Sequence, residues 1–227
     1  MTAPPPPPPP PPLRFERVPL SLEVPARHTV AVLGDENSGV GLLAGYALGL
    51  ERPPTEGGRA LVFDTELWSL AEPERLAFRR RVGYLPAGDG LLQNLSLRDN
   101  VALPLRFGSG ATPKEIEGRV NVMLAAVRLT AVAARRPAQA NEEERRRAAL
   151  ARAIAFDPAL LLLEQPFDGL TARAASELLE LARGGESAEG ARRTILITGQ
   201  EIPPVILRRV EQVYRLTRTG TLEPETV

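Results

Sequence analysis

The sequence contains no cysteine, one histidine and one lysine. The absence of cysteine excludes disulfides and thiol catalysis, and it is compatible with a cytosolic location. The histidine is His28, so the C-terminal half offers no histidine for acid–base chemistry. The lysine is Lys114, and every other basic side chain is an arginine. A site that needs a lysine at any other position is therefore incomplete in this chain.

Long hydrophobic runs and net charge are lacking as well. No apolar run reaches the roughly 18 residues of a membrane-spanning helix, and the start has neither the basic nor the apolar region of a signal peptide. The 28 basic and 28 acidic residues cancel at pH 7, so no general attraction to nucleic acid is implied. An apolar content of 43% in 227 residues is enough for one domain with a hydrophobic core, with or without a small subdomain.

Proline is concentrated at the start, where residues 4–12 are nine consecutive prolines. Proline cannot donate to a helix or a sheet, so residues 1–12 are predicted to form a disordered tail or a polyproline II rod. Such a rod could bind an aromatic-lined groove, although a solvated tail is the favoured interpretation.

Residues 13–227 alternate between strand and helix patterns, which indicates an α/β domain with a largely parallel sheet. Helical patterns dominate residues 88–156 and predict a helical subdomain inserted into that sheet. Strands are expected at 21–24, 29–33, 59–63, 82–85, 160–163, 194–198 and 212–216. Helices are expected at 42–50, at 76–81, from 95 to Pro104, and at 113–129, 142–156 and 172–183.

A glycine-rich loop follows the strand at 29–33 and precedes the helix at 42–50. Its residues are Gly34, Asp35, Glu36, Asn37, Ser38, Gly39, Val40 and Gly41. The glycine spacing is that of a phosphate-binding loop, in which a lysine and then a serine or threonine follow the second glycine. Val40 and Gly41 occupy those two positions, while Asp35 and Glu36 add charge that repels phosphate.

Two polar residues, Glu164 and Gln165, follow the apolar run at 160–163. Side chains at the carboxyl end of this strand would lie near a ligand of the glycine-rich loop. In a phosphate-loop enzyme the first would be an aspartate that orients Mg²⁺, and the second a glutamate that activates water. Glu164 is a weak candidate metal ligand, and Gln165 cannot act as a base.

The order of residues 145–154, Asp157-Pro158 and 160–170 resembles the ATP-binding subunit, or nucleotide-binding domain, of ABC transporters. The resemblance covers about 13–222 and implies a P-loop NTPase-like sheet with helices on both faces plus an ABC-type helical subdomain. Residues 99–106 are similar to the cassettes of bacterial Mla/Mce-type lipid transporters.

The resemblance also identifies further departures from the family pattern. The glutamine that senses Mg²⁺ is replaced by Ala87, and the switch histidine by Gly199. The signature is replaced by Asn141 and three glutamates, and Thr171 stands where an aspartate is expected. Phe15 is the one nearby candidate for the aromatic that stacks on adenine.

These losses together favour a pseudo-ATPase, a scaffold or regulator of a transport complex that could carry lipid. Neither ATP nor Mg²⁺ would be required, although the backbone amides of 35–41 could hold nucleotide weakly. The alternatives are a slow or partner-dependent ATPase and an adaptor that uses the proline tail. The implied partners are a second cassette and a membrane permease, which would hold the chain at the cytoplasmic face of the membrane. The candidate permease contacts are Leu91, Leu92, Leu95 and Leu97, which could equally be core.

Overall fold

The structure is a computed structural model that describes residues 10–18, 20–54, 56–184 and 192–225. Its central six-stranded sheet has the order β10-β9-β3-β8-β7-β6. All neighbours pair in parallel except β10 and β9, which are antiparallel. The strands are β3 (Thr29–Leu33), β6 (Val82–Leu85), β7 (Leu160–Glu164), β8 (Thr194–Gly199), β9 (Gln212–Leu216) and β10 (Leu222–Pro224).

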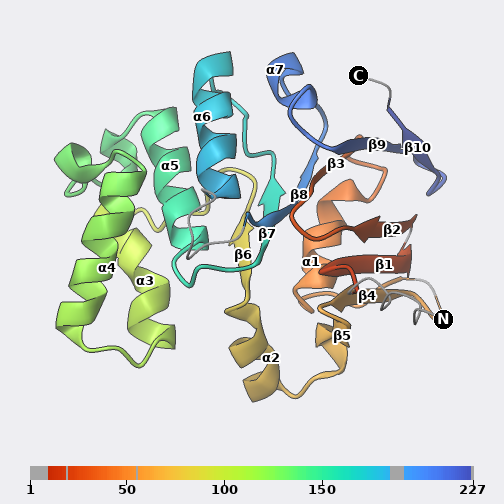
Figure 1. The fold of residues 1–227 in the computed structure, drawn as a ribbon, viewed down its shortest axis with the longest axis horizontal. Coiled ribbons are helices and arrows are strands. Elements are labelled where there is room, and N and C mark those ends of the chain that lie inside the picture. Colours follow the sequence, from red (N-terminus) through yellow and green to blue (C-terminus); the bar gives the residue numbers. More distant parts are fainter. Residues whose placement is uncertain (1–9, 19, 55, 185–191, 226–227) are drawn as a thin grey trace, which may run out of the picture.

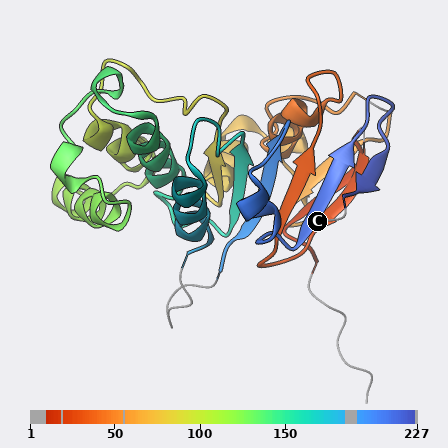
Figure 2. The same ribbon diagram turned by 90° about the horizontal axis from the view of Figure 1, so that it is seen from above.

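A second, antiparallel sheet of four strands lies beside the first in the order β2-β1-β4-β5. Its strands are β1 (Leu13–Val18), β2 (Leu20–Val24), β4 (Arg59–Val62) and β5 (Thr65–Glu66). Helix α1 packs with this sheet, while α3, α4 and α5 gather at the opposite end of the molecule (Figures 1 and 2).

The α-helices are α1 (Leu43–Ala47), α2 (Glu72–Arg79), α3 (Leu97–Gly108), α4 (Pro113–Ala126), α5 (Glu142–Ala153), α6 (Ala172–Arg183) and α7 (Pro204–Leu207). Short 3-10 turns occur at Val40–Leu42, Leu67–Ser69, Thr130–Val132 and Pro137–Gln139. Within the described residues, no helix combines the length and hydropathy needed to cross a bilayer.

The six-stranded sheet separates two hydrophobic clusters because successive strand side chains point to opposite faces. On β7, Leu161 and Leu163 join the helix-side cluster, which includes side chains of α3, α5 and α6. Leu160 and Leu162 join the second cluster, which lies toward the antiparallel sheet and α1. Both faces of β7 are thus covered, as expected for an apolar parallel strand.

The predicted α/β class, with a largely parallel sheet and helices on both faces, is confirmed. The boundaries expected at 29–33, 82–85, 172–183 and 212–216 coincide with β3, β6, α6 and β9. Helix α4 begins at a capping box: the Thr112 side chain accepts from the Glu115 backbone, and the Glu115 side chain accepts from the Thr112 backbone.

Four local expectations are wrong. The helix expected at 76–81 is α2, which spans Glu72–Arg79. Helix α3 continues through Pro104 to Gly108, since proline forfeits one backbone bond while Val101 and Leu105 remain buried. The helix expected at 42–50 is shorter, because the chain turns at Gly49, whose φ is +60°. Phe15 is 1% exposed inside the second cluster, so it offers no face for stacking.

Residues 1–9 of the predicted proline tail lie outside the described residues. The tail's last residue belongs to the fold, because the Pro12 carbonyl accepts a hydrogen bond from the Phe63 amide at 2.9 Å.

Candidate functional site

Backbone amides of the glycine-rich loop at 34–41 make hydrogen bonds to acceptors within the loop. The backbone amide of Asn37 donates to Oδ1 of Asp35 at 2.9 Å, and the backbone amide of Ser38 donates to the Asp35 carbonyl at 3.1 Å. The Val40 amide donates to Oγ of Ser38 at 3.3 Å. An anion-binding loop presents such amides to its ligand. Here three of them already have acceptors inside the loop.

Ser38 turns inward, which explains why position 34 is a glycine. A Cβ on Gly34 would lie 2.3 Å from Oγ of Ser38, closer than any real contact. Gly39 adopts a φ of +84°, which glycine permits without steric cost. Both glycines therefore have a structural explanation that needs no phosphate.

Val40 lies at the position of the phosphate-loop lysine and is 5% exposed. Its side chain belongs to the second hydrophobic cluster with residues of β1, β3 and α1. Gly41 is exposed, and a Cβ added there would meet nothing within 4 Å. The position that should carry a cation thus contributes to the core, and the next position is open.

Asp35 is held by Arg218, which lies in the turn between β9 and β10. Nε of Arg218 donates to Oδ2 of Asp35 at 2.7 Å. This bond, and then the Asn37 and Ser38 amides, hold the pKa of Asp35 below its ordinary value. The Arg218 cation beside the loop is therefore already matched by a carboxylate.

One carboxylate oxygen of Glu164 accepts hydrogen bonds from two donors. The hydroxyl of Tyr84 on β6 donates to Oε2 of Glu164 at 2.8 Å, and the Ala87 amide donates to the same oxygen at 3.3 Å. Burial and the Glu164 bond raise the pKa of Tyr84 above its ordinary value. The hydroxyl therefore stays protonated and remains a donor.

Gln165 and Gly199 lie next to each other at the carboxyl ends of β7 and β8. The backbone amide of Gln165 donates to the Thr198 carbonyl at 2.7 Å, and Gln165 has a φ of +44°. A Cβ on Gly199 would lie 3.6 Å from Cγ of Gln165. The Gly199 carbonyl accepts from the Gly34 amide at 2.9 Å, so the loop, β7 and β8 meet at one edge.

The segment at 140–144 closes the start of α5 with its own side chains. Oδ1 of Asn141 accepts from the backbone amide of Glu144 at 2.8 Å, and Oε2 of Glu144 accepts from the backbone amide of Asn141 at 2.9 Å. This reciprocal cap satisfies donors that a helix otherwise offers to an anion.

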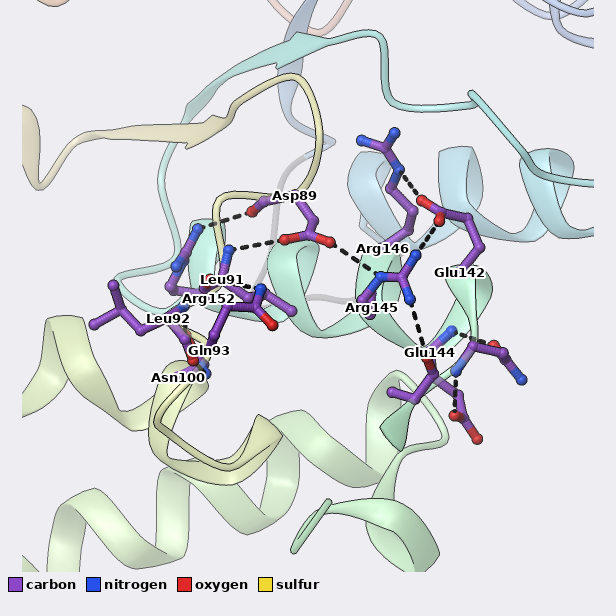
Figure 3. A network of polar contacts seen from close by, with 12 residues as sticks. Asp89, Leu91, Leu92, Gln93, Asn100, Glu142, Glu144, Arg145, Arg146 and Arg152 are labelled. Carbon is purple, nitrogen blue, oxygen red and sulfur yellow. Dashed lines mark hydrogen bonds and ion pairs between the residues drawn. The ribbon is translucent and has the colours of Figure 1, made fainter. Parts of the chain in front are cut away.

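Glu142 adds a carboxylate in the first turn of α5. Its side chain pairs with Arg145 and with Arg146, and it packs against Gly169. Figure 3 shows Glu142 with both arginines. The helix start is therefore occupied by an intramolecular anion.

A polar network that no sequence pattern indicated ties the loop after β6 to α5 (Figure 3). Asp89 is 5% exposed; its Oδ1 accepts from the Leu91 amide at 2.8 Å, and its Oδ2 lies 3.2 Å from Nε of Arg145. Arg152 donates to the carbonyls of Asp89 and Gly90 at 3.0 and 2.8 Å. The loop that carries Ala87 is thus fastened to the helical region.

The four candidate leucines differ in exposure. Leu91 and Leu97 are 5% and 0% exposed and belong to the helix-side cluster. Leu92 is 44% exposed and Leu95 is half-buried. Only Leu92 and Leu95 of this set therefore offer surface to a partner.

An apolar groove of about 740 Å³ lies between α2 and α3. Leu76 and Phe107 on its walls are 54% and 85% exposed. In the described part of the chain, the charged residues that line it are all arginines: Arg79, Arg80 and Arg152.

The side chains at the edge of the sheet do not fit Mg-ATP. The lysine position is apolar, the carboxylate at the end of β7 is engaged by Tyr84, and the start of α5 has its own cap. Nor do the described residues contain a cluster of three or more metal-ligating side chains.

The fold, the sheet edge with its glycine-rich loop and the arginine-rich helix that follows residues 140–144 define an ATP-binding cassette. The ABC transporter family matches residues 18–168, and the chain belongs to this family.

Among its relatives, the lipoprotein-releasing system ATP-binding protein LolD of Chromohalobacter salexigens is 32% identical over 198 residues, covering 87% of this chain and 81% of LolD. The methionine import ATP-binding protein MetN 2 of Pseudomonas aeruginosa (strain UCBPP-PA14) is 30% identical over 192 residues. The alignment covers 85% of this chain, which spans 56% of MetN 2. The dimeric structure of MJ0796, a bacterial ABC transporter cassette, superposes with a TM-score of 0.77 at 23% identity, over 91% of this chain and 87% of MJ0796.

Proposed function

We propose that this chain is a cassette subunit that supports a transport complex as a scaffold or regulator without hydrolysing ATP. The observation that carries the proposal is the burial of Val40 at the lysine position, 5% exposed in a hydrophobic cluster. A lysine there supplies a charge-assisted contact to phosphate. Val40 lacks this charge, and its side chain packs in the core instead.

The other nucleotide positions support the same proposal because each has a contact inside the chain. Asp35 pairs with Arg218, Glu164 accepts from Tyr84, and Asn141 caps α5. If this cassette pairs with an intact one, one composite site has this loop and the other has this α5 start. Both sites would be impaired, so ATP would not readily close such a dimer.

The proposed partners are a second cassette and a membrane permease that holds the chain at the cytoplasmic face of the membrane. The groove between α2 and α3 supports the permease proposal, since its exposed Leu76 and Phe107 suit an apolar helix. Leu92 and Leu95 add surface in the loop that leads into α3.

Lipid-like cargo is proposed on the similarity to LolD, whose name refers to lipoprotein release. The relatives named for methionine or sulfate import suggest small solutes instead. Purification of the complex with its permease, followed by mass spectrometry of bound lipid, tests the cargo proposal.

Isothermal titration of the full chain with Mg-ATP tests the proposed loss of nucleotide binding. We expect no heat of binding at micromolar concentrations, and the relative LolD serves as the positive control. Micromolar affinity that is lost in a Gly39→Val variant would contradict the proposal, because binding would then depend on the loop.

A slow or partner-dependent ATPase is the competing function. It is favoured by the retained glycine spacing and by the open space at Gly41. Steady-state phosphate release by the chain, alone and with its partner cassette, measures it. Hydrolysis that disappears in Gln165→Ala would establish the ATPase and exclude the pseudoenzyme.

An adaptor role of the proline tail is a third proposal, because polyproline II segments dock in aromatic-lined grooves. Deletion of residues 1–9 is the appropriate test. It leaves Pro12 in place, whose carbonyl accepts a hydrogen bond from the Phe63 amide. Partner capture that survives the deletion excludes the adaptor role.

A further inference from the structure

A second groove, of about 670 Å³, lies between the α4–α5 corner and α6, away from the loop at 34–41. Its floor is apolar and includes Val127, Ile154 and Leu181, while five arginines line it. It runs along α6 from Arg173 to Gly184, a distance of roughly 16 Å at the helical rise per residue. We call this surface the α6 groove.

Three arginines converge on one carboxylate at the first end of the α6 groove. Glu177 lies 3.2 Å from Nη1 of Arg128, 2.7 Å from Nη2 of Arg147 and 2.9 Å from Nε of Arg173. Arg147 is buried and also pairs with Glu143. Arg128 and Arg173 therefore share a single carboxylate, and their side chains are 71% and 86% exposed.

Arg128 is held at this end by an unusual backbone conformation. It follows α4 with a φ of +60°, where glycine is the ordinary residue. The left-handed conformation costs a larger residue about 1 kcal/mol. Arg17 and Arg27 adopt the same left-handed conformation elsewhere in the chain, so the case for Arg128 depends on its exposure and its shared carboxylate.

The far end of the α6 groove carries Arg193 and Arg209. Arg193 pairs with Asp157, and Arg209 shares Glu180 with Arg183. Arg183 and Arg192 in turn share Glu211. Among the described residues, Arg209 thus shares its carboxylate with a second arginine, as Arg128 and Arg173 do at the first end.

We propose that the α6 groove binds an acidic peptide segment of a partner protein, with carboxylates at both ends of an apolar centre. Extended chain advances about 3.3 Å per residue, so about five residues span the roughly 16 Å that the groove covers along α6. Charge complementarity fixes the ends, and Ile154 and Leu181 receive the apolar centre. The inference does not depend on nucleotide, so it stands or falls apart from the proposed function.

Fluorescence anisotropy of the full chain with a blocked synthetic peptide tests the inference. The peptide has paired glutamates at each end of a Leu-Val-Leu centre, and its control replaces every glutamate by glutamine. We expect Arg128→Ser with Arg173→Ser to weaken binding by about tenfold or more, since two charged contacts are lost. Arg119→Ser with Arg208→Ser, two exposed arginines outside the groove, should change affinity less than about twofold.

The absence of cysteine provides an independent, site-specific measurement. A Ser176→Cys variant places one thiol in the groove lining, and bound peptide should slow its reaction with maleimide. A Ser69→Cys variant, on an exposed turn, should react at an unchanged rate. Folding of every variant is checked by circular dichroism.

Several outcomes would overturn the assignment. Equal binding of the glutamine peptide would remove the role of charge, and equal weakening by the two arginine pairs would indicate unspecific attraction. Better protection of Ser176→Cys by a single-stranded oligonucleotide or by tripolyphosphate would assign the groove to a different anion. No binding of the acidic peptide at millimolar concentration would also overturn it.

Discussion

The glycine-rich loop at 34–41 and the α6 groove differ in how their donors are used. The loop has the glycine spacing of an anion site, yet its amides at Asn37, Ser38 and Val40 have acceptors inside the loop. The α6 groove has no recognised motif, yet Arg128 and Arg173 share one carboxylate. The comparison teaches that a motif predicts backbone shape, whereas the capacity to bind an anion depends on which donors and charges remain unmatched.

Val40→Lys is the most severe test of the closed loop. A lysine in this cluster has no partner and must be desolvated, so we expect the free energy of unfolding to fall by about 3 kcal/mol or more. Urea denaturation measures the effect. The control, Val40→Ala, should cost roughly 2 kcal/mol through lost packing. A Val40→Lys chain as stable as the parent would show that the loop opens freely.

Asn141→Ala asks whether the α5 start is held by its cap. Loss of an N-cap side chain costs about 1 kcal/mol, and Thr112→Ala at the capping box of α4 is the matched comparison. We expect similar shifts of the urea midpoint. Unchanged stability in Asn141→Ala alone would mean that the α5 start does not rely on this closure.

Acid titration sharpens the description of the α6 groove. Arg173 and then Arg147 lower the pKa of Glu177 from 4.5 to about 2. Because the folded pKa is depressed, the ion pairs stabilise the fold above pH 4.5, and this contribution is lost as the pH falls toward 2. Arg173→Gln should raise the Glu177 pKa toward 4.5, as measured by NMR titration of the carboxylate. A titration unchanged by Arg173→Gln would contradict the arrangement, and Glu177→Gln identifies the signal.

Gln165→Glu is expected to have the smallest effect. General-base help is worth roughly 10²–10⁴-fold where the rest of a site is intact, but Val40, Gly41 and the Tyr84–Glu164 contact are unchanged in this variant. Phosphate release should stay at background, as it should in Gln165→Ala. A gain of about 100-fold would show that the loop still positions nucleotide.

Local patterns predicted most of the fold. The strands β3 and β6 and the helix α6 have the expected boundaries. Each follows a local burial pattern: consecutive residues in β3, and residues at helical spacing in α6. Pro104 shows where local preference fails, since packing of α3 outweighs one lost bond. The short strands β5 and β10 were missed, as two or three residues carry no periodicity.

The candidate site was predictable in position but not in contacts. The resemblance to ABC cassettes implied that Val40, Ala87, Glu164 and Gly199 belong to one region. The bonds that close this region join residues far apart in the chain, such as Asp35 with Arg218 and Tyr84 with Glu164. No local pattern encodes such a pair. The same holds for Arg128 and Arg147, which reach Glu177 from other elements, whereas Arg173 and Glu177 are a local i,i+4 pair on α6.

The partition of the core by the six-stranded sheet has a further consequence for motion. Val40 packs in the cluster shared with β1 and β4, whereas α5 and α6 pack in the other cluster. Cooperative opening of a protein follows its packed units. Deuterium uptake at the Val40 amide should therefore keep pace with that of the antiparallel sheet and be independent of the helices that carry the α6 groove. On the proposed loss of nucleotide, no ligand would connect these two clusters, and we expect them to open independently.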